Sequence, residues 1–188
     1  RIAGEAHPGE TLRAMIRTGE VAQAVEAAGA SAVCVHGRTK TMLYSGIADW
    51  DAIRAVREAV RIPVVANGDV FDAEAALRCA KRTGASLLMI GRSAFGNPWV
   101  FPQVEAALSG NELPPLPPLA RRMDTAMHQF ELAREDKGDH IACLEARKHF
   151  AWYLRGVAHS SYYKEKISSI STPEDVEAIA KGIRRDLQ

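Results

Sequence analysis

The stretch that decides the fold is Ile62-Pro63-Val64-Val65-Ala66-Asn67-Gly68-Asp69, a short apolar run that ends in three polar or flexible residues. Its apolar part is short and β-branched, and it carries no charge. Such a run is typical of a strand buried on both faces of a parallel sheet. The sequence therefore predicts a strand at residues 63–66 with Asn67, Gly68 and Asp69 at its carboxyl end.

Two other stretches repeat this arrangement. Residues 32–36 lead into His36-Gly37-Arg38, and residues 87–90 lead into Gly91-Arg92-Ser93. Amphipathic stretches rich in Ala, Glu and Arg surround these runs and predict helices at residues 12–28, 50–60, 72–83 and 98–108. Asp49 and Asp72 stand where helix N-caps belong, and Gly29 and Gly84 where helices end.

This alternation of strands and helices indicates βαβ units and a parallel sheet. Three successive strands that each end in polar residues and a glycine favour a TIM barrel, because the active site of that fold is built from the carboxyl ends of its strands. The expected fold class is therefore α/β, with residues 1–110 forming the last βα units of a partial (β/α)8 barrel.

A proline-rich stretch separates two parts of the chain. Residues 111–118 read NELPPLPP, and so many prolines neither continue a helix nor enter a central strand. We interpret them as a stiff linker. Beyond it the pattern is helical at residues 119–136, 141–156, 162–169 and 173–186, which predicts a small all-α domain at residues 119–188.

The bulk composition excludes several classes of protein. Of the 188 residues, 47% are hydrophobic and 25% charged, as in an ordinary globular protein, and the net charge of +1 gives no overall attraction to nucleic acid. No apolar run has the length of a membrane span, and the first residues do not resemble a signal peptide. Cys34, Cys79 and Cys143 lie far apart, which argues against a zinc or other metal site and against disulfides, and suits a reducing cytoplasm. We expect all three to be buried, with Cys34 inside its strand.

Each strand end has a functional and a structural interpretation. Backbone amides at Gly91 can face a phosphate, with Arg92 adding a charge-assisted bond, or the pair is a simple turn with a surface arginine. Gly68 allows a ligand to approach the backbone, with Asn67 and Asp69 as polar contacts, but Asn-Gly-Asp is also a common turn. His36 can donate to a ring carbonyl or be structural. Their succession favours the functional interpretation, since the loops after the last two strands of such barrels often bind phosphate.

The same residues carry a resemblance to a known family. Val35-His36-Gly37-Arg38-Thr39, Tyr44-Ser45-Gly46-Ile47-Ala48-Asp49-Trp50, the stretch from Ile62 to Asp69 and Met89-Ile90-Gly91-Arg92 with Gly96-Asn97-Pro98-Trp99 resemble the tRNA-dihydrouridine synthases. Arg147-Lys148-His149 and Trp152-Tyr153-Leu154-Arg155-Gly156 look like the helical C-terminal domain of that family. The resemblance runs from about residue 1 to residue 180.

The resemblance implies a flavoenzyme of the cytoplasm. FMN would be held by His36, Asn67, Gly68, Asp69, Gly91 and Arg92, with its phosphate at Gly91-Arg92, and Arg38 would lie near the flavin and the substrate uridine. NADPH would reduce FMN, and reduced FMN would pass a hydride to the C5=C6 bond of a uridine that has left the base stack of tRNA. The implied enzyme binds no metal or membrane and is monomeric at full length.

The chain also departs from the family. The catalytic cysteine of the family belongs to the first half of the barrel, and Cys34 is no substitute because it is expected to lie inside a strand. Arg1 stands where the Lys-Ile-Arg strand of the family ends, so Arg1-Ile2-Ala3 is expected to be the end of a strand. We therefore expect no turnover from the isolated chain.

The segment from Arg147 to Lys166 carries five basic residues against Glu165 alone, a local net charge of +4, interleaved with aromatic residues. RNA recognition uses such groups, although an amphipathic helix with buried aromatics has the same pattern. The resemblance favours a tRNA-facing surface that includes Arg147, Lys148 and Arg155. Two alternatives stay open: another phosphate-binding TIM-barrel enzyme, and a non-catalytic fragment that only binds tRNA.

Overall fold

The computed structural model describes the backbone of residues 8–187 and the side chains from Thr18 onward, so the expected strand end at Arg1-Ile2-Ala3 lies outside the described residues. Contacts divide the chain into two compact units, each described by itself. The first contains α1 to α4 and the sheet, and ends at Pro114. The second contains the segment Ala94–Trp99 and everything from Pro115 onward.

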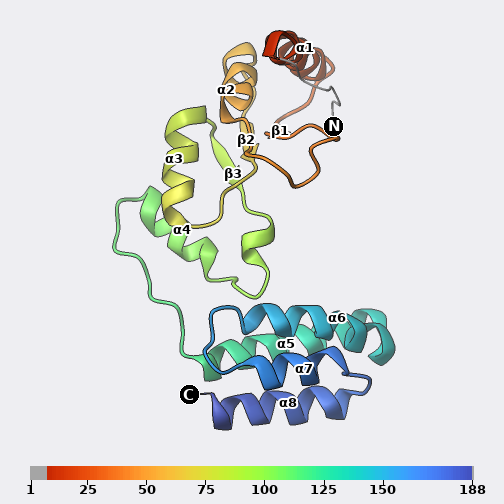
Figure 1. Ribbon diagram of the computed structural model, residues 1–188. Coiled ribbons are helices and arrows are strands. Elements are labelled where there is room, and N and C mark those ends of the chain that lie inside the picture. The colour runs from red at the N-terminus through yellow and green to blue at the C-terminus, as the bar shows by residue number, and fades with distance from the viewer. Residues whose placement is uncertain (1–7, 188) are drawn as a thin grey trace. The chain divides into compact units, whose positions relative to one another are not determined.

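The first unit alternates strands and helices as the sequence predicts (Figure 1). Its elements are α1 (Pro8–Ala27), β1 (Val33–His36), α2 (Trp50–Ala59), β2 (Val64–Asn67), α3 (Ala73–Thr83), β3 (Leu87–Met89), a 3-10 turn (Arg92–Ala94) and α4 (Val100–Leu108). Asp49 and Asp72 cap α2 and α3 by accepting backbone N–H groups, and Gly84 ends α3 in the left-handed region with φ of 64°. These three caps confirm the predicted helix boundaries.

The three strands form one parallel sheet in the order β1-β2-β3. His36 pairs with Asn67, and Asn67 pairs with Met89, so the three strands end level with one another. Parallel strands with this register bring their carboxyl ends to one edge of the sheet. The prediction that the three polar strand ends lie together is confirmed.

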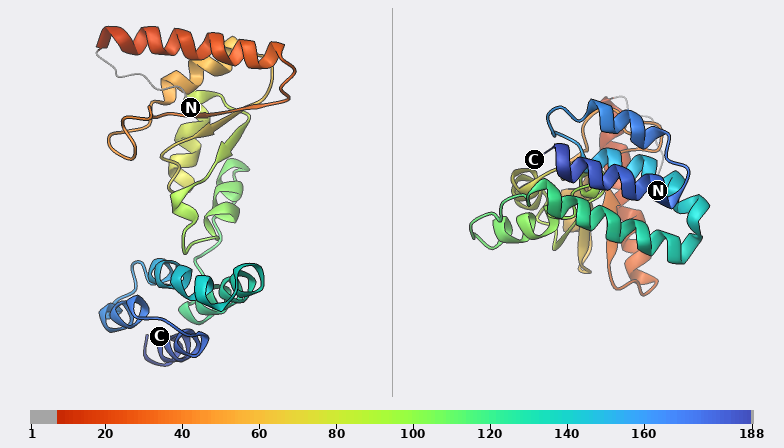
Figure 2. Two further views of the ribbon diagram at one scale, coloured as in Figure 1. Left: turned by 90° about the vertical axis from the view of Figure 1, so that its right-hand side faces the viewer. Right: turned by 90° about the horizontal axis from the view of Figure 1, so that it is seen from below.

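The two faces of the sheet differ in burial. Val64 and Ala66 of β2 are fully buried, on the face covered by α2 and α3, whose Ile53 and Cys79 are also fully buried. On the other face Cys34 and Met89 are exposed, as is Leu87. The expectation of strands buried on both faces is therefore wrong, since Val65 of β2 is also only half-buried on this face, and so is the expectation of a buried Cys34. Within the described residues, helices cover only one side of this sheet (Figure 2).

The second unit contains four helices, α5 (Leu119–Lys137), α6 (Asp139–Tyr153), α7 (Ser161–Ser168) and α8 (Pro173–Asp186). They enclose one apolar core, whose largest buried side chains include Met123, Phe130, Phe150, Ile167, Ile170 and Ile183. Cys143 lies in this core and Cys79 in the first unit, so both are buried as expected. The proline-rich residues 111–118 are mostly exposed and form neither helix nor strand.

The segment Ala94–Trp99 packs with the second unit although it follows the third strand. Phe95 stacks on Trp152, with ring centroids 4.2 Å apart and an angle of 11° between the planes. Trp99 meets Tyr153 edge to face at 6.2 Å. The predicted helix at residues 98–108 begins only at Val100, because the residues before it form the turn that reaches α6.

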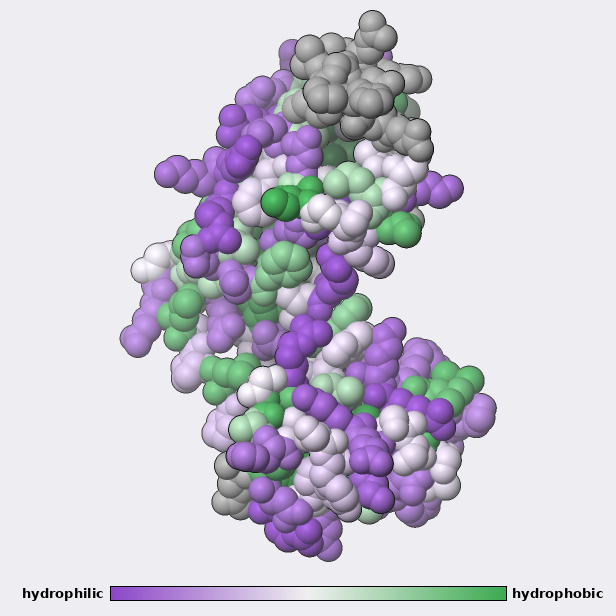
Figure 3. Space-filling model, in the orientation of Figure 1, coloured by the Kyte–Doolittle hydropathy of each residue, from purple (hydrophilic) through white to green (hydrophobic). Residues whose placement is uncertain are grey.

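The length and hydropathy of the helices bear on whether any of them could cross a membrane. Within residues 8–187, none of the helices combines the length and apolar character that crossing a bilayer demands. In the view of Figure 3, polar residues separate the apolar ones over both units.

Candidate functional site

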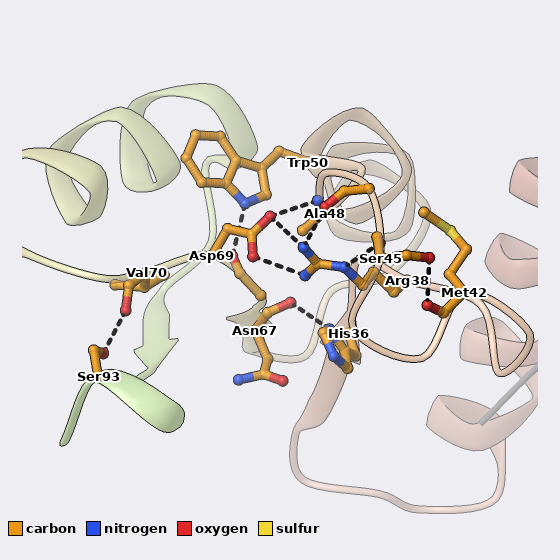
Figure 4. A network of polar contacts seen from close by, with 12 residues as sticks. His36, Arg38, Met42, Ser45, Ala48, Trp50, Asn67, Asp69, Val70 and Ser93 are labelled. Carbon is orange, nitrogen blue, oxygen red and sulfur yellow. Dashed lines mark hydrogen bonds and ion pairs between the residues drawn. The ribbon is translucent and has the colours of Figure 1, made fainter. Parts of the chain in front are cut away.

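Asn67 bonds to the ends of both neighbouring strands, and Figure 4 shows its contact with His36. Its carbonyl accepts the N–H of Gly37 at 2.9 Å and lies 3.1 Å from Nδ1 of His36. Its side-chain Nδ2 donates to the carbonyl of Met89 at 2.9 Å. Asn67 therefore contacts the ends of both neighbouring strands and fixes them relative to β2.

Arg38 and Asp69 form a bidentate ion pair between the first and second strand ends. Both Nη1–Oδ1 and Nη2–Oδ2 distances are 2.8 Å, and the side chains are only 4% and 11% exposed. Arg38 also donates from Nε to the carbonyl of Ser45 at 3.0 Å and from Nη2 to that of Gly46 at 2.8 Å. Most of its N–H groups are therefore already used inside the protein.

Asp69 is held from both sides in this arrangement. Its Oδ2 also accepts the backbone N–H of Ala48 at 2.7 Å, and its φ is 57°, in the left-handed region that few non-glycine residues adopt. Burial opposes ionisation of this carboxyl, but the hydrogen bonds from Arg38 and Ala48 outweigh it and lower the pKa of Asp69 below its usual range. Asp69 is therefore a carboxylate across the neutral pH range.

Gly68 occupies a position that a side chain would not fit. Its φ is +124°, and a Cβ there would lie 2.8 Å from Cβ of Ala48 and 3.0 Å from Nδ1 of His36. Its carbonyl accepts Nε1–H of Trp50 at 2.9 Å. Trp50, the first residue of α2, thereby links the start of this helix to the second strand end.

The third strand end is open. Gly91 has no heavy atom within 4 Å of the position that a Cβ would take, and both Gly91 and Arg92 are exposed. Within the described residues Arg92 has no carboxylate partner, and its guanidinium lies 4.4 Å from the ring centroid of Tyr44. Ser93 Oγ donates to the carbonyl of Val70 at 2.8 Å, which joins this end to the loop after β2.

Two contributions to this site were not assigned from the sequence, those of Tyr44 and Ser93. The sequence analysis names Tyr44 only among the residues that carry the family resemblance, and it lies in the loop between β1 and α2. A loop of this length directly after a functional strand end is itself a signal, because unusually long βα loops often carry function. Ser93 stands in the polar tripeptide that follows the third strand, but its bond to the carbonyl of Val70 was not expected from the sequence.

The basic side chains between Arg147 and Lys166 differ in their surroundings, since some are exposed and Arg147 is bonded within the protein. Lys148 and Arg155 are exposed, and Nζ of Lys148 lies 5.0 Å from the ring centroid of Trp152. Arg147 is partly buried and donates from Nε to the carbonyl of Ile170 at 2.7 Å. The aromatic residues Phe150, Tyr153 and Tyr163 are buried, as the sequence analysis expects for most aromatics of this segment, and Tyr162 is 61% exposed.

The described residues contain no group of three or more His, Cys, Asp or Glu placed to hold a metal ion. Cys34 lies on the exposed face of the sheet, with Sγ 3.8 Å from Sδ of Met89. Partial burial raises the pKa of the Cys34 thiol above its usual value. This thiol therefore stays protonated at neutral pH.

Comparison with known proteins gives one consistent result. The family described as Dihydrouridine synthase (Dus) matches residues 13–187. A probable tRNA-dihydrouridine synthase of Rhodobacter capsulatus is 42% identical over 143 residues, which cover 76% of this chain and 44% of that protein. One from Rickettsia conorii is 35% identical over 153 residues, with 81% and 46% covered, and tRNA-dihydrouridine synthase B of Pasteurella multocida is 33% identical over 156 residues, with 83% and 47% covered.

The chain thus spans about half the length of the curated relatives that it matches. The match extends over the strand ends, the proline-rich residues 111–118 and the helices α5 to α8 alike. On these grounds the chain belongs to the dihydrouridine synthase family.

Proposed function

We propose that this chain supplies the flavin-phosphate end and the tRNA-facing helices of an FMN-dependent tRNA-dihydrouridine synthase. In this proposal the first unit is the last part of a TIM barrel and the helices after residue 118 are a tRNA-binding domain. The observation that carries it is the level register of the three strands, which places His36, Asn67 and Gly91 at one edge of the sheet.

The residues present fit an FMN phosphate at the third strand end. Gly91 leaves open space beside the backbone, and the exposed guanidinium of Arg92 has no carboxylate partner among the described side chains. A phosphate is the type of group that such an amide turn and an arginine bind together. Gly91 and Arg92 would therefore hold the phosphate of FMN.

The other strand ends would orient the rest of the cofactor. His36 is exposed, and Asn67 holds it in place while using its own amide to hold β3. Gly68 keeps the second strand end free of a side chain, and Asp69 acts through its bonds to Arg38 and Ala48. FMN, once reduced by NADPH, would supply the hydride, and a separate acid the proton, that together saturate the C5=C6 bond of a tRNA uridine.

The chain's share in the reaction is to bind and orient. None of its described cysteines is placed as a proton donor at the strand ends, since Cys79 and Cys143 are buried and Cys34 lies within β1. We therefore propose that the complete enzyme needs the half that the relatives carry beyond the matched region. The proposal places this enzyme in the cytoplasm as a monomer.

Flavin binding tests the proposal directly. FMN titrated into the chain should lose fluorescence with a saturable dependence, and Arg92→Gln should weaken this binding. Arg82→Gln is the matched control, because Arg82 is also an exposed arginine of the first unit but pairs with Asp51 on the helical side of the sheet. Equal affinity in all three proteins, or no saturable binding in any, would contradict the flavin assignment.

Activity tests the second part. The isolated chain with FMN, NADPH and unmodified tRNA should form no dihydrouridine. Measurable NADPH-dependent formation would show that the chain is catalytically sufficient. Membership of the family weakens the alternative of an unrelated phosphate-binding barrel enzyme, whereas tRNA binding without flavin binding would favour the non-catalytic RNA-binding alternative.

A further inference from the structure

We infer that Arg38, Asp69 and Tyr44 are positioning residues for Arg92. Through the loop after β1 they fix the orientation of the Arg92 guanidinium, which would hold the flavin phosphate. This inference rests on the proposed function for its ligand. It assigns Arg38 a role through other protein residues instead of a contact with the substrate.

The first step is the occupied state of Arg38. Its guanidinium faces the carboxylate of Asp69 and the carbonyls of Ser45 and Gly46, and its side chain is 4% exposed. Nε and Nη2 donate to acceptors within the protein, and Nη1, which has no hydrogen-bond partner, is buried beside Oδ1 of Asp69, so little of the guanidinium is available to a ligand. Bidentate arginine pairs fix geometry as well as charge. Arg38 is therefore built to hold the loop.

The second step is the part of the loop that is held. Ser45, Gly46 and Ala48 are the three points of attachment, two to Arg38 and one to Asp69. Gly46 has φ of +65°, which suits the tight turn at this point. Figure 4 shows these bonds meeting on one side of the Arg38–Asp69 pair. The residue just before them is Tyr44, so its backbone is anchored on the C-terminal side.

The third step is the contact between Tyr44 and Arg92. The Arg92 guanidinium lies 4.4 Å from the Tyr44 ring centroid, within the range of cation–π attraction. Tyr44 is 69% exposed and therefore has little other packing to explain its place. Arg92 has no ion pair within the described part of the chain, so the ring is the contact that limits its orientation. Three strand ends are thus connected through one loop.

The chemistry favours this arrangement for an anion site. A ring face holds an arginine without neutralising it, whereas a carboxylate partner would compete with phosphate. The Asp69 carboxylate is bonded to Arg38 and Ala48 and forms no ion pair with Arg92, although the charge of Arg92 contributes to lowering the pKa of Asp69. Arg92 therefore keeps its charge for a phosphate while its side chain is restrained.

The experiment uses the whole chain with five variants: Tyr44→Phe, Tyr44→Leu, Arg38→Gln, Asp69→Asn and the double variant Arg38→Gln with Tyr44→Leu. Asp51→Asn is the matched control, because Asp51 forms a similar bidentate pair with Arg82, but its side chain is 46% exposed and joins α2 to α3 without a bond to Ser45, Gly46 or Ala48. Circular dichroism establishes that each variant is folded. Tyr44→Leu changes an exposed residue, so it keeps the test valid if a buried-pair variant does not fold.

The first readout needs no ligand. The NMR signals of the Arg92 δ-methylene protons should be shifted by the Tyr44 ring, and Arg92→Lys identifies them. This shift should persist in Tyr44→Phe and Asp51→Asn and disappear in Tyr44→Leu, Arg38→Gln and Asp69→Asn. Trypsin cleavage after Lys40 should also accelerate several-fold in Arg38→Gln and Asp69→Asn. An Arg92 shift that survives Asp69→Asn or Arg38→Gln would overturn the inference.

The second readout is affinity for FMN. Tyr44→Leu should weaken FMN binding about 2- to 5-fold, which corresponds to an exposed cation–π contact, and Tyr44→Phe should not. The double variant should bind no more weakly than Arg38→Gln alone, because both changes act through the same ring. A loss of FMN affinity in Arg38→Gln with unchanged Lys40 cleavage would instead make Arg38 a direct ligand. If neither the parent chain nor any variant binds FMN, the proposed function fails. The NMR readout, which needs no ligand, still decides the inference in that case.

Discussion

Gly96 lies directly against the backbone of Trp152, so closely that a Cβ on Gly96 would stand 2.4 Å from the Trp152 carbonyl carbon and 2.5 Å from the Tyr153 nitrogen. Gly96 is buried and has φ of +67°. The glycine is what allows the turn after the third strand to rest on the end of α6. The stack of Phe95 on Trp152 depends on this approach.

Gly96→Ala should therefore destabilise the chain by about 1–3 kcal/mol, since it adds a backbone clash to the cost of a positive φ. The free energy of unfolding from urea titration, followed by Trp fluorescence, measures this. Gly138→Ala is the control, because Gly138 also has a positive φ of 80° but nothing within 4 Å of its Cβ position. Equal losses in the two variants would show that the contact with α6 contributes nothing.

Protonation of His149 should make the chain less stable in mild acid, because the folded state favours the neutral ring. Burial lowers the pKa of His149 below its usual value, and Lys148 and Lys137 act in the same direction while Glu145 opposes them. A lowered folded pKa means that the unfolded chain takes up the proton first as pH falls. The stabilisation is thus present above the ordinary histidine pKa of about 6.5 and is lost as pH falls through it toward the folded value.

Thermal melts at pH 7.5 and pH 5.5 test this expectation. The decrease in Tm between these pH values should be smaller in His149→Gln than in the parent chain. His140→Gln serves as control because His140 is exposed. Identical pH dependence in all three proteins would remove His149 as the cause.

Charge reversal at Lys148 or Arg155 should weaken tRNA binding. Both are exposed on the second unit, so each can meet a phosphate without disturbing the core. The salt dependence of log K should become shallower by about 1 for each tRNA phosphate that the variant no longer neutralises. Filter binding of tRNA at several salt concentrations provides the slopes, with Lys181→Glu on the exposed side of α8 as the control. Unchanged affinity and slope for Lys148→Glu and Arg155→Glu would place the RNA surface elsewhere.

The N-terminus of α8 should depend on its capping box. The Thr172 side chain accepts the N–H of Asp175, and Asp175 returns a bond to the N–H of Thr172 at 3.0 Å. Thr172→Ala should cost about 0.5–2 kcal/mol in unfolding free energy, whereas Thr172→Ser keeps the hydroxyl and should cost much less. Urea titration of the two variants side by side makes the comparison, and an equally large loss in the serine variant would argue against the cap.

The sequence by itself determined the order of strands and helices, the helix caps and the residues at the strand ends. These follow from local rules. The side chains of Asp49 and Asp72 accept the free N–H groups of the helices that begin directly after them. Pro173 starts α8 because its missing N–H costs nothing there. The residues that resemble the family, from His36 to Arg92, were also evident from the sequence, and the match to the family agrees with them.

Only the tertiary structure decided how those residues are used. Whether Arg38 faces a ligand or Asp69 depends on residues that lie far apart in the chain, and pairing of β1 with β2 is what brings them within 2.8 Å. Burial of a strand face likewise depends on what packs against it, so Cys34 and Met89 are exposed although their strands are apolar. A pattern in the sequence records what a segment prefers, whereas contacts across the fold determine which groups remain free to bind.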